Sequence, residues 1–251
     1  MKDSYLIYSA IIFSISFLSV NLQGKNKKEN NDAEHLVKAS SNPKGENKLP
    51  NILIIGDSIS LGYTVPVRKL LDGKANVFRP PGNCQHSGRG LRYIKKWVGD
   101  KKWDVIHFNF GIWDSHYLKD GKLVSGAKNF AKYKLTELKL RYTTKEYLEN
   151  ITKILAVLKK TKAKIIWAST TPVTFWNKER KVFQIEKNKA VAKLMKKEGV
   201  SINDLYAFVN PEIKKWQRRD GCHFTKVGSN NLAKKVVESI TKELRHKKKK
   251  R

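Results

Sequence analysis

The sequence predicts an α/β fold with a parallel β-sheet, and two observations lead to this prediction. Short apolar runs alternate along the chain with longer stretches in which apolar residues keep helical spacing. Glycine and polar residues follow the apolar runs directly, as expected at the carboxyl edge of a parallel sheet. Such alternation implies parallel strands joined by right-handed crossovers. With 251 residues, 40% of them hydrophobic, we expect one domain with a full core.

The beginning of the chain differs in composition from the rest. Residues 1–23 carry Lys2 and then an apolar run from Leu6 to Leu22, which predicts a signal peptide. An uncleaved run that anchors the protein in a membrane is the alternative. We therefore expect a secreted or periplasmic protein.

Two further segments lack the composition of a core. Residues 24–49 contain scarcely any large apolar side chain, and they are expected to form a disordered linker. Residues 246–251 form a basic tail of the same kind. The folded domain is therefore expected over residues 50–245.

The first strand is expected at residues 52–55, where an apolar run with three isoleucines stops at Gly56. A run of this kind is typical of a strand buried on both faces. Asp57 and Ser58 follow at the carboxyl edge, before a helix. Ser58 is therefore a candidate nucleophile, and a helix cap is the alternative role for either residue.

The second strand is expected at residues 75–79, and it leads into a loop at residues 80–88 that is rich in turn formers. The next amphipathic helix is marked by Leu91, Ile94 and Trp97.

The third strand is expected at residues 103–111. The irregular stretch that follows, residues 117–142, predicts a lid or a substrate-facing insertion, because it starts at the carboxyl edge of that strand. Its aromatic residues Phe130, Tyr133 and Tyr142 are candidates for stacking on sugar rings. The alternative is that they anchor the insertion to the core.

The remaining elements continue the alternation. Thr143 and Glu146 form a predicted capping box at the start of a helix. Further elements are expected as strands at residues 164–169 and 200–203, and as helices at residues 184–197 and 227–244.

A possible base for the serine lies far downstream, at Asp220 and His223. Serine is a weak nucleophile at neutral pH, so it needs a base within hydrogen-bonding distance and a third group that orients the base. An isolated Asp-x-x-His is more often a helix cap beside an exposed histidine. Its pairing with Gly56-Asp57-Ser58, in this order along the chain, makes the combination much more specific.

These motifs resemble the SGNH, or GDSL, hydrolase family. Gly56-Asp57-Ser58, with Gly62 four residues after the serine, resembles the first block of the family, and residues 220–223 resemble the last. The resemblance covers about residues 50–242. It implies a three-layer α/β/α sandwich of flavodoxin type with a five-stranded parallel sheet, and an ester hydrolase that needs no cofactor.

The resemblance also implies roles for individual residues. Ser58 is the expected nucleophile, His223 the general base and Asp220 its orienting partner. The same resemblance implies an oxyanion hole that includes Ser58 and a glycine amide, for which Gly82 is the first candidate and Gly88 the second. Asn83 is expected to add a side-chain donor, and a plain turn is the alternative for this loop.

The third block departs from the family pattern. Where the family usually has Gly-x-Asn-Asp, this chain has Trp113 at the asparagine position. We expect Asn109 or Asn83 to supply the missing donor, the loss of which costs about 10² to 10³ in rate. Asp57, Trp113 and Asp114 are expected to bind substrate.

The two cysteines, Cys84 and Cys222, fall on loops that the fold would bring to the same edge of the sheet. In an oxidising compartment they are candidates for a disulfide, and two free thiols are the alternative. No ligand cluster with zinc spacing occurs, so no metal is expected.

The net charge of +30 favours binding to polyanions. No nucleic-acid motif is present, and a lysine bias across the whole proteome is the simplest alternative. We therefore expect an exported short-chain carbohydrate esterase that acts on an acylated, anionic polysaccharide. No specific nucleic-acid partner and no stable membrane insertion after signal cleavage are expected. A lipase or thioesterase of the same family, or a catalytically weak carbohydrate-binding protein on this scaffold, are the alternatives.

Overall fold

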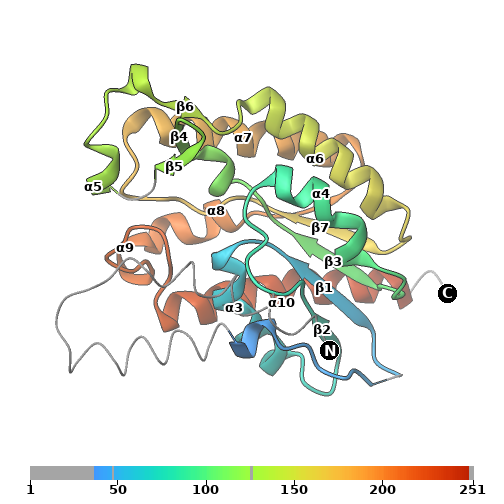
Figure 1. Ribbon diagram of the computed structural model, residues 1–251. Coiled ribbons are helices and arrows are strands. Elements are labelled where there is room, and N and C mark those ends of the chain that lie inside the picture. Colours follow the sequence, from blue (N-terminus) through green and yellow to red (C-terminus); the bar gives the residue numbers. More distant parts are fainter. Residues whose placement is uncertain (1–36, 47, 125–126, 249–251) are drawn as a thin grey trace, which may run out of the picture.

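The computed structural model describes residues 37–46, 48–124 and 127–248. Within these residues, a five-stranded parallel sheet lies between two layers of helices, which confirms the predicted fold class (Figure 1). The strand order is β2-β1-β3-β7-β8. The strands are β1 (Asn51–Ile55), β2 (Asn76–Phe78), β3 (Val105–Phe108), β7 (Lys164–Ala168) and β8 (Ser201–Asn203).

Helices cover both faces of this sheet (Figure 1). One face carries α3 (Ser58–Leu70), α8 (Leu205–Val209), α9 (Ile213–Trp216) and α10 (Lys226–Lys248). The other face carries α4 (Ser87–Val98), α6 (Thr144–Lys159) and α7 (Lys178–Lys197).

The sequence of strand β1 is continuously apolar because both of its faces are buried. Successive side chains of a strand point to opposite faces of the sheet. Ile52 and Ile54 belong to the core beneath α3 and α10, whereas Leu53 and Ile55 belong to the core beneath α4 and α6. All four are at most 1% exposed. The polar residues that follow β1 are thereby fixed at the carboxyl edge of the sheet.

The insertion is more regular than the sequence suggested. It contains a small antiparallel sheet in the order β5-β4-β6, with a short helix and a 3-10 turn between β5 and β6. Its elements are β4 (Tyr117–Lys119), β5 (Lys122–Val124), α5 (Ala127–Phe130), η2 (Leu135–Glu137) and β6 (Lys139–Leu140). The ring of Phe130 packs 5.6 Å from that of Tyr117, and the ring of Tyr142 lies 5.7 Å from that of His86. Tyr142 therefore anchors the insertion to the residue that caps α4. Phe130 packs within the insertion and beneath the Arg180 guanidinium group of α7, and Tyr133 is 37% exposed.

The structure confirms one predicted helix boundary and changes two others. The capping box is confirmed, since Thr143 Oγ1 accepts from Glu146 N and Glu146 Oε2 accepts from Thr143 N. Helix α7 begins six residues before the predicted start, because the Asn177 side chain accepts from Arg180 N at 3.0 Å and caps it. Helix α10 continues through residue 248 into the predicted basic tail.

The described residues before β1 are attached to the domain, where the sequence predicted a linker. Ala39 is fully buried. The Asn76 side chain exchanges two hydrogen bonds with the backbone of Glu46, of 2.9 and 2.8 Å. The predicted signal peptide, residues 1–23, lies outside the described residues. Among the described residues, no helix has the length and apolar character that crossing a membrane requires.

Gly90 permits the close packing of α4, and its substitution tests this contact. A Cβ at Gly90 would lie 2.5 Å from Phe110 Cζ and 3.1 Å from Ile154 Cδ1. We expect Gly90→Ala to lower the free energy of unfolding by about 1 to 3 kcal/mol, because the overpacking exceeds the gain in helix propensity. Gly62→Ala in α3 is the control, since its Cβ would meet only Ser229 Oγ, at 3.3 Å. Equal denaturant midpoints for the two variants would contradict this prediction.

Candidate active site

The structure brings Ser58, His223 and Asp220 together at the carboxyl edge of β1. Ser58 is the first residue of α3, and the other two residues lie on the loop before α10. His223 Nε2 lies 2.9 Å from Ser58 Oγ, and His223 Nδ1 lies 3.0 Å from Asp220 Oδ2. Both distances are hydrogen-bonding distances. The three side chains therefore form one hydrogen-bonded chain, although 165 positions separate the serine and the histidine.

Asp220 is held in its charged form. Its Oδ1 accepts hydrogen bonds from the backbone amides of Cys222 and His223, at 2.9 and 2.8 Å. Burial opposes the charge, but the hydrogen bonds from the His223 side chain and from these amides together lower the pKa of Asp220 to about 2. A carboxylate in this position keeps the proton of the histidine on Nδ1 and leaves Nε2 free to face the serine.

Asp57 is buried and caps α3, which corrects its predicted role in binding substrate and agrees with the alternative role as a helix cap. Its Oδ1 accepts from Ile59 N at 3.0 Å, and its side chain is 1% exposed. Burial raises the pKa of Asp57 to about 6, against the opposing effects of the Ile59 amide and of the nearby His223 and Arg79.

Two predicted oxyanion-hole donors are used elsewhere. Gly82 is exposed, and its N–H donates to Ser40 Oγ at 3.3 Å. The Asn109 side chain is buried and donates to the backbone oxygen of Ala168 at 2.7 Å, which joins the ends of β3 and β7. Both predictions are therefore corrected. The position in the motif placed these residues near the serine, but their donor groups bind the hydroxyl group of Ser40 and the backbone oxygen of Ala168, which are distant in the sequence.

Gly88, the second glycine candidate, lies inside α4 rather than in the loop. A side chain there would collide with the hydroxyl group of Tyr142, so this glycine permits close packing of the insertion.

Asn83 lies in the loop that contacts the residue after β1. The next residue, Cys84, donates its backbone N–H to Gly56 O at 3.3 Å, and Gly56 lies two residues before Ser58. Asn83 is partly buried, and its Oδ1 accepts from Gln85 N at 2.8 Å. This bond orients the carboxamide and leaves its Nδ2 hydrogens available.

Trp113 and Asp114 lie in the 3-10 helix η1 (Trp113–Ser115) after β3, and they differ in exposure. Trp113 is partly buried, with its ring 5.6 Å from that of His116. Asp114 is fully buried and accepts hydrogen bonds from the backbone amide and the hydroxyl group of Ser87. Burial raises the pKa of Asp114 to about 6. Asp114 therefore anchors the start of α4, and its predicted role in substrate binding is corrected.

The cysteines are free in the structure, with Cys84 buried and Cys222 partly buried. No disulfide therefore joins the two loops. Among the residues that the structure describes, no group of three or more His, Cys, Asp or Glu side chains is arranged to hold a metal ion.

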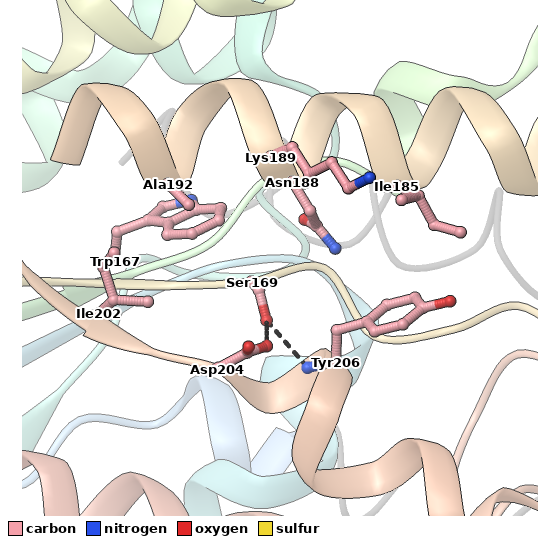
Figure 2. Close-up of a pocket in the computed structure, with 9 residues that line it drawn as sticks. All are labelled: Trp167, Ser169, Ile185, Asn188, Lys189, Ala192, Ile202, Asp204 and Tyr206. Atoms are coloured by element: carbon pink, nitrogen blue, oxygen red, sulfur yellow. Dashed lines mark hydrogen bonds between the residues drawn. The ribbon is translucent and has the colours of Figure 1, made fainter. Parts of the chain in front are cut away.

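A separate pocket of about 270 Å³ lies beside the edge strand β8 (Figure 2). Ser169 Oγ donates to Asp204 Oδ1 at 2.7 Å and accepts from Tyr206 N at 2.8 Å (Figure 2). None of the three candidate catalytic residues lines this pocket. The pocket is lined by Trp167, Ser169, Ile185, Asn188, Lys189, Ala192, Ile202, Asp204 and Tyr206.

Comparison with protein families identifies the chain. Residues 52–236 match the family described as GDSL-like lipase/acylhydrolase. The chain belongs to this family. The match runs from β1 into the first half of α10, so it includes both segments of the candidate triad in this acylhydrolase.

Solved structures share the fold of this acylhydrolase at low sequence identity. An acetyl xylan esterase superposes with a TM-score of 0.58 at 15% identity, covering 76% of this chain and 99% of its own. A putative acylhydrolase from Bacteroides fragilis gives 0.59 at 17% identity, with 84% and 95% covered. An acetylxylan esterase from Geobacillus stearothermophilus gives 0.61 at 17% identity, with 76% and 94% covered. No curated protein matches the sequence at a significant level.

The raised pKa of Asp57 predicts a specific dependence of stability on pH. Folding raises this pKa from about 4 to about 6, so the native state binds the extra proton and the free energy of unfolding falls as pH rises between these values. Asp57→Asn removes this contribution, and we expect a shallower decline measured by urea unfolding. The difference should reach at most about 3 kcal/mol, since one pKa unit corresponds to about 1.4 kcal/mol.

Asp114→Asn is the comparison variant, because the pKa of Asp114 is also about 6. Stability profiles of wild type and Asp57→Asn that run parallel between pH 4 and pH 6, the range set by the ordinary and raised pKa values, would contradict the prediction.

Proposed function

We propose that this acylhydrolase is an exported short-chain carbohydrate esterase that uses a Ser58-His223-Asp220 triad. The observation that carries the proposal is the continuous hydrogen-bonded chain from Ser58 Oγ through both nitrogens of His223 to Asp220. A serine, a base and an orienting carboxylate in this arrangement are the requirements for acyl transfer through a serine.

In the proposed reaction, Ser58 Oγ attacks the ester carbonyl carbon while His223 Nε2 takes the hydroxyl proton. Asp220 stabilises the imidazolium that forms and does not itself accept the proton. The tetrahedral intermediate collapses when His223 returns the proton to the alcohol oxygen, which leaves as the sugar hydroxyl. A water molecule, deprotonated by His223, then attacks the carbonyl carbon of the acyl-enzyme. His223 returns this proton to Ser58 Oγ as the acyl–oxygen bond breaks, which releases the carboxylic acid and regenerates the serine.

The negative charge of the tetrahedral intermediate needs hydrogen-bond donors near Ser58. We propose the Ser58 N–H, at the start of α3, as one donor. The Nδ2 group of Asn83 is the second, because Cys84 holds this loop against Gly56 and the Gln85 amide orients the carboxamide. This assignment supplies the donor that the family motif would place at Trp113.

A polysaccharide substrate is supported by two observations. Two of the structural relatives cited above are acetylxylan esterases by their descriptions. The insertion at the carboxyl edge presents exposed lysines, which favour an anionic polymer. These exposed lysines are Lys122, Lys128, Lys132, Lys134 and Lys139.

Substitution of the nucleophile tests the proposed chemistry. We expect the wild type to hydrolyse p-nitrophenyl acetate and Ser58→Ala to lose about 10⁴-fold or more in kcat, as enzymes of this type do without their nucleophile. Steady-state kinetics on purified protein provide the measurement, and circular dichroism checks that the variant is folded. Activity that persists in Ser58→Ala would exclude this serine as the nucleophile.

The acyl group and the glycan are tested with the same preparation. We expect kcat/KM to fall from acetate to butyrate to octanoate, and acetate to be released from an acetylated polysaccharide. Preference for octanoate would indicate a lipid ester, whereas binding of the polysaccharide without release of acetate would indicate a carbohydrate-binding protein.

Asn83→Ala tests the second oxyanion donor. We expect kcat to fall by about 10² to 10³ with little change in KM, because the lost bond acts mainly in the transition state. Trp113→Phe is the matched variant, since it removes the indole N–H but keeps an aromatic ring, and it should keep kcat near that of the wild type. The opposite result, a large loss in Trp113→Phe and none in Asn83→Ala, would assign the donor to the tryptophan.

A further inference from the structure

The loop that carries Asn83 and Cys84 needs a physical support, because it contains two prolines and a glycine and forms no regular structure. Its only backbone bond to the end of β1 is Cys84 N to Gly56 O, at 3.3 Å, among the described residues. A shift of the loop of about 1 Å would be enough to misplace a catalytic donor. The Arg79 side chain holds this loop directly, and the Asn42 side chain holds the backbone of Arg79.

Arg79 supports the loop from inside the protein. Its side chain is 1% exposed. Its Nη2 donates to Gly56 O at 3.2 Å and to Gly82 O at 3.0 Å, and its Nε donates to Pro80 O at 3.2 Å. One guanidinium group therefore joins the loop to the backbone two residues before Ser58.

Only a planar guanidinium can make this set of contacts. Its donors point in fixed directions in one plane, whereas a lysine has one ammonium group on a flexible stem. Arg79 Nη1 also donates to Thr64 Oγ1 at 3.3 Å, which adds α3 to the segments that the group connects.

Asn42 supports Arg79 from outside. Asn42 Oδ1 accepts from Arg79 N, and Asn42 Nδ2 donates to Arg79 O, both at 2.9 Å. β2 is the edge strand of the sheet and ends at Phe78. The carboxamide thus satisfies the two backbone groups that a neighbouring strand would otherwise pair. Arg68 Nη2 donates to Asn42 Oδ1 at 3.1 Å and fixes the carboxamide in turn.

We propose that Asn42 and Arg79 are positioning residues for the esterase reaction, and that the segment before β1 is part of the catalytic domain. The inference rests on the proposed function. Asn42 fixes the backbone of Arg79, and the Arg79 side chain fixes residues 80–85 against the end of β1. In this proposal, these contacts hold Asn83 in place to donate to the oxyanion. Ser40 adds a weaker contact to the same loop through Gly82 N.

Asn42→Ala, with Ser41→Ala as matched control, tests the outer contact in the full domain. The Ser41 hydroxyl group contacts only Val37 O, in the neighbouring turn. We expect Asn42→Ala to lower kcat on p-nitrophenyl acetate by about tenfold or more at unchanged KM, because misplacement of a donor acts on the transition state. Asn42→Asp keeps the acceptor for Arg79 N, so its kcat should lie between those of Asn42→Ala and Ser41→Ala.

Arg79 is tested by rescue, since a buried arginine variant risks misfolding. We expect Arg79→Ala and Arg79→Lys to lose more activity than Asn42→Ala. We also expect guanidinium chloride at low concentration to restore part of kcat in Arg79→Ala but not in the other variants. A role in stability alone would lower the melting temperature of these variants but would leave kcat of the folded protein unchanged.

Hydrogen exchange separates this inference from the proposed function. We expect faster amide exchange over residues 80–85 in Asn42→Ala than in Ser41→Ala, whether or not an ester is hydrolysed. A wild type that hydrolyses no ester would contradict the proposed function, and the exchange would still decide whether Asn42 holds the loop. Unchanged exchange, or a kcat of Asn42→Ala equal to that of Ser41→Ala, overturns the proposal.

Discussion

The packing of α3 against α10 on one face of the sheet is the constraint on which the candidate site depends. Ser58 opens α3, and His223 lies just before α10, so the distance between the two helices sets the distance between nucleophile and base. The apolar alternation of β1 fixes α3 in turn, since two of its isoleucines pack beneath both helices. The hydrogen-bonding distance of 2.9 Å between Ser58 Oγ and His223 Nε2 is therefore a result of core packing, not of local sequence.

The polar groups beneath the site differ in function from those that face it. Asp57 caps α3, Asp114 anchors α4, and Arg79 joins the end of β1 to the loop after β2. Each of these side chains is at most 1% exposed. Buried polar groups of this kind are costly unless they are hydrogen bonded, so they fix the backbone around them. Ser58, His223 and Asp220 can then remain partly exposed and still keep a defined geometry.

The motifs predicted which three side chains meet better than they predicted the supporting contacts. A serine after an apolar strand and a distant Asp-x-x-His were sufficient to select Ser58, His223 and Asp220, because few other roles require this combination. Gly82 and Asn109 were selected by their position in a motif alone. Their donor groups instead bind Ser40 and Ala168, and these partners come from segments that the sequence does not show to be adjacent.

The sequence by itself determined the order of strands and helices, the parallel sheet and the edge where polar residues gather, since these follow from local periodicity and the geometry of crossovers. The tertiary structure decided which residues lie in the candidate active site and which are buried beneath it. Burial assigned Asp57 and Asp114 to structural roles, and contacts across the fold attached Asn42 to Arg79. The physical reason is that burial and long-range hydrogen bonds depend on the packing of distant segments, which no local pattern specifies.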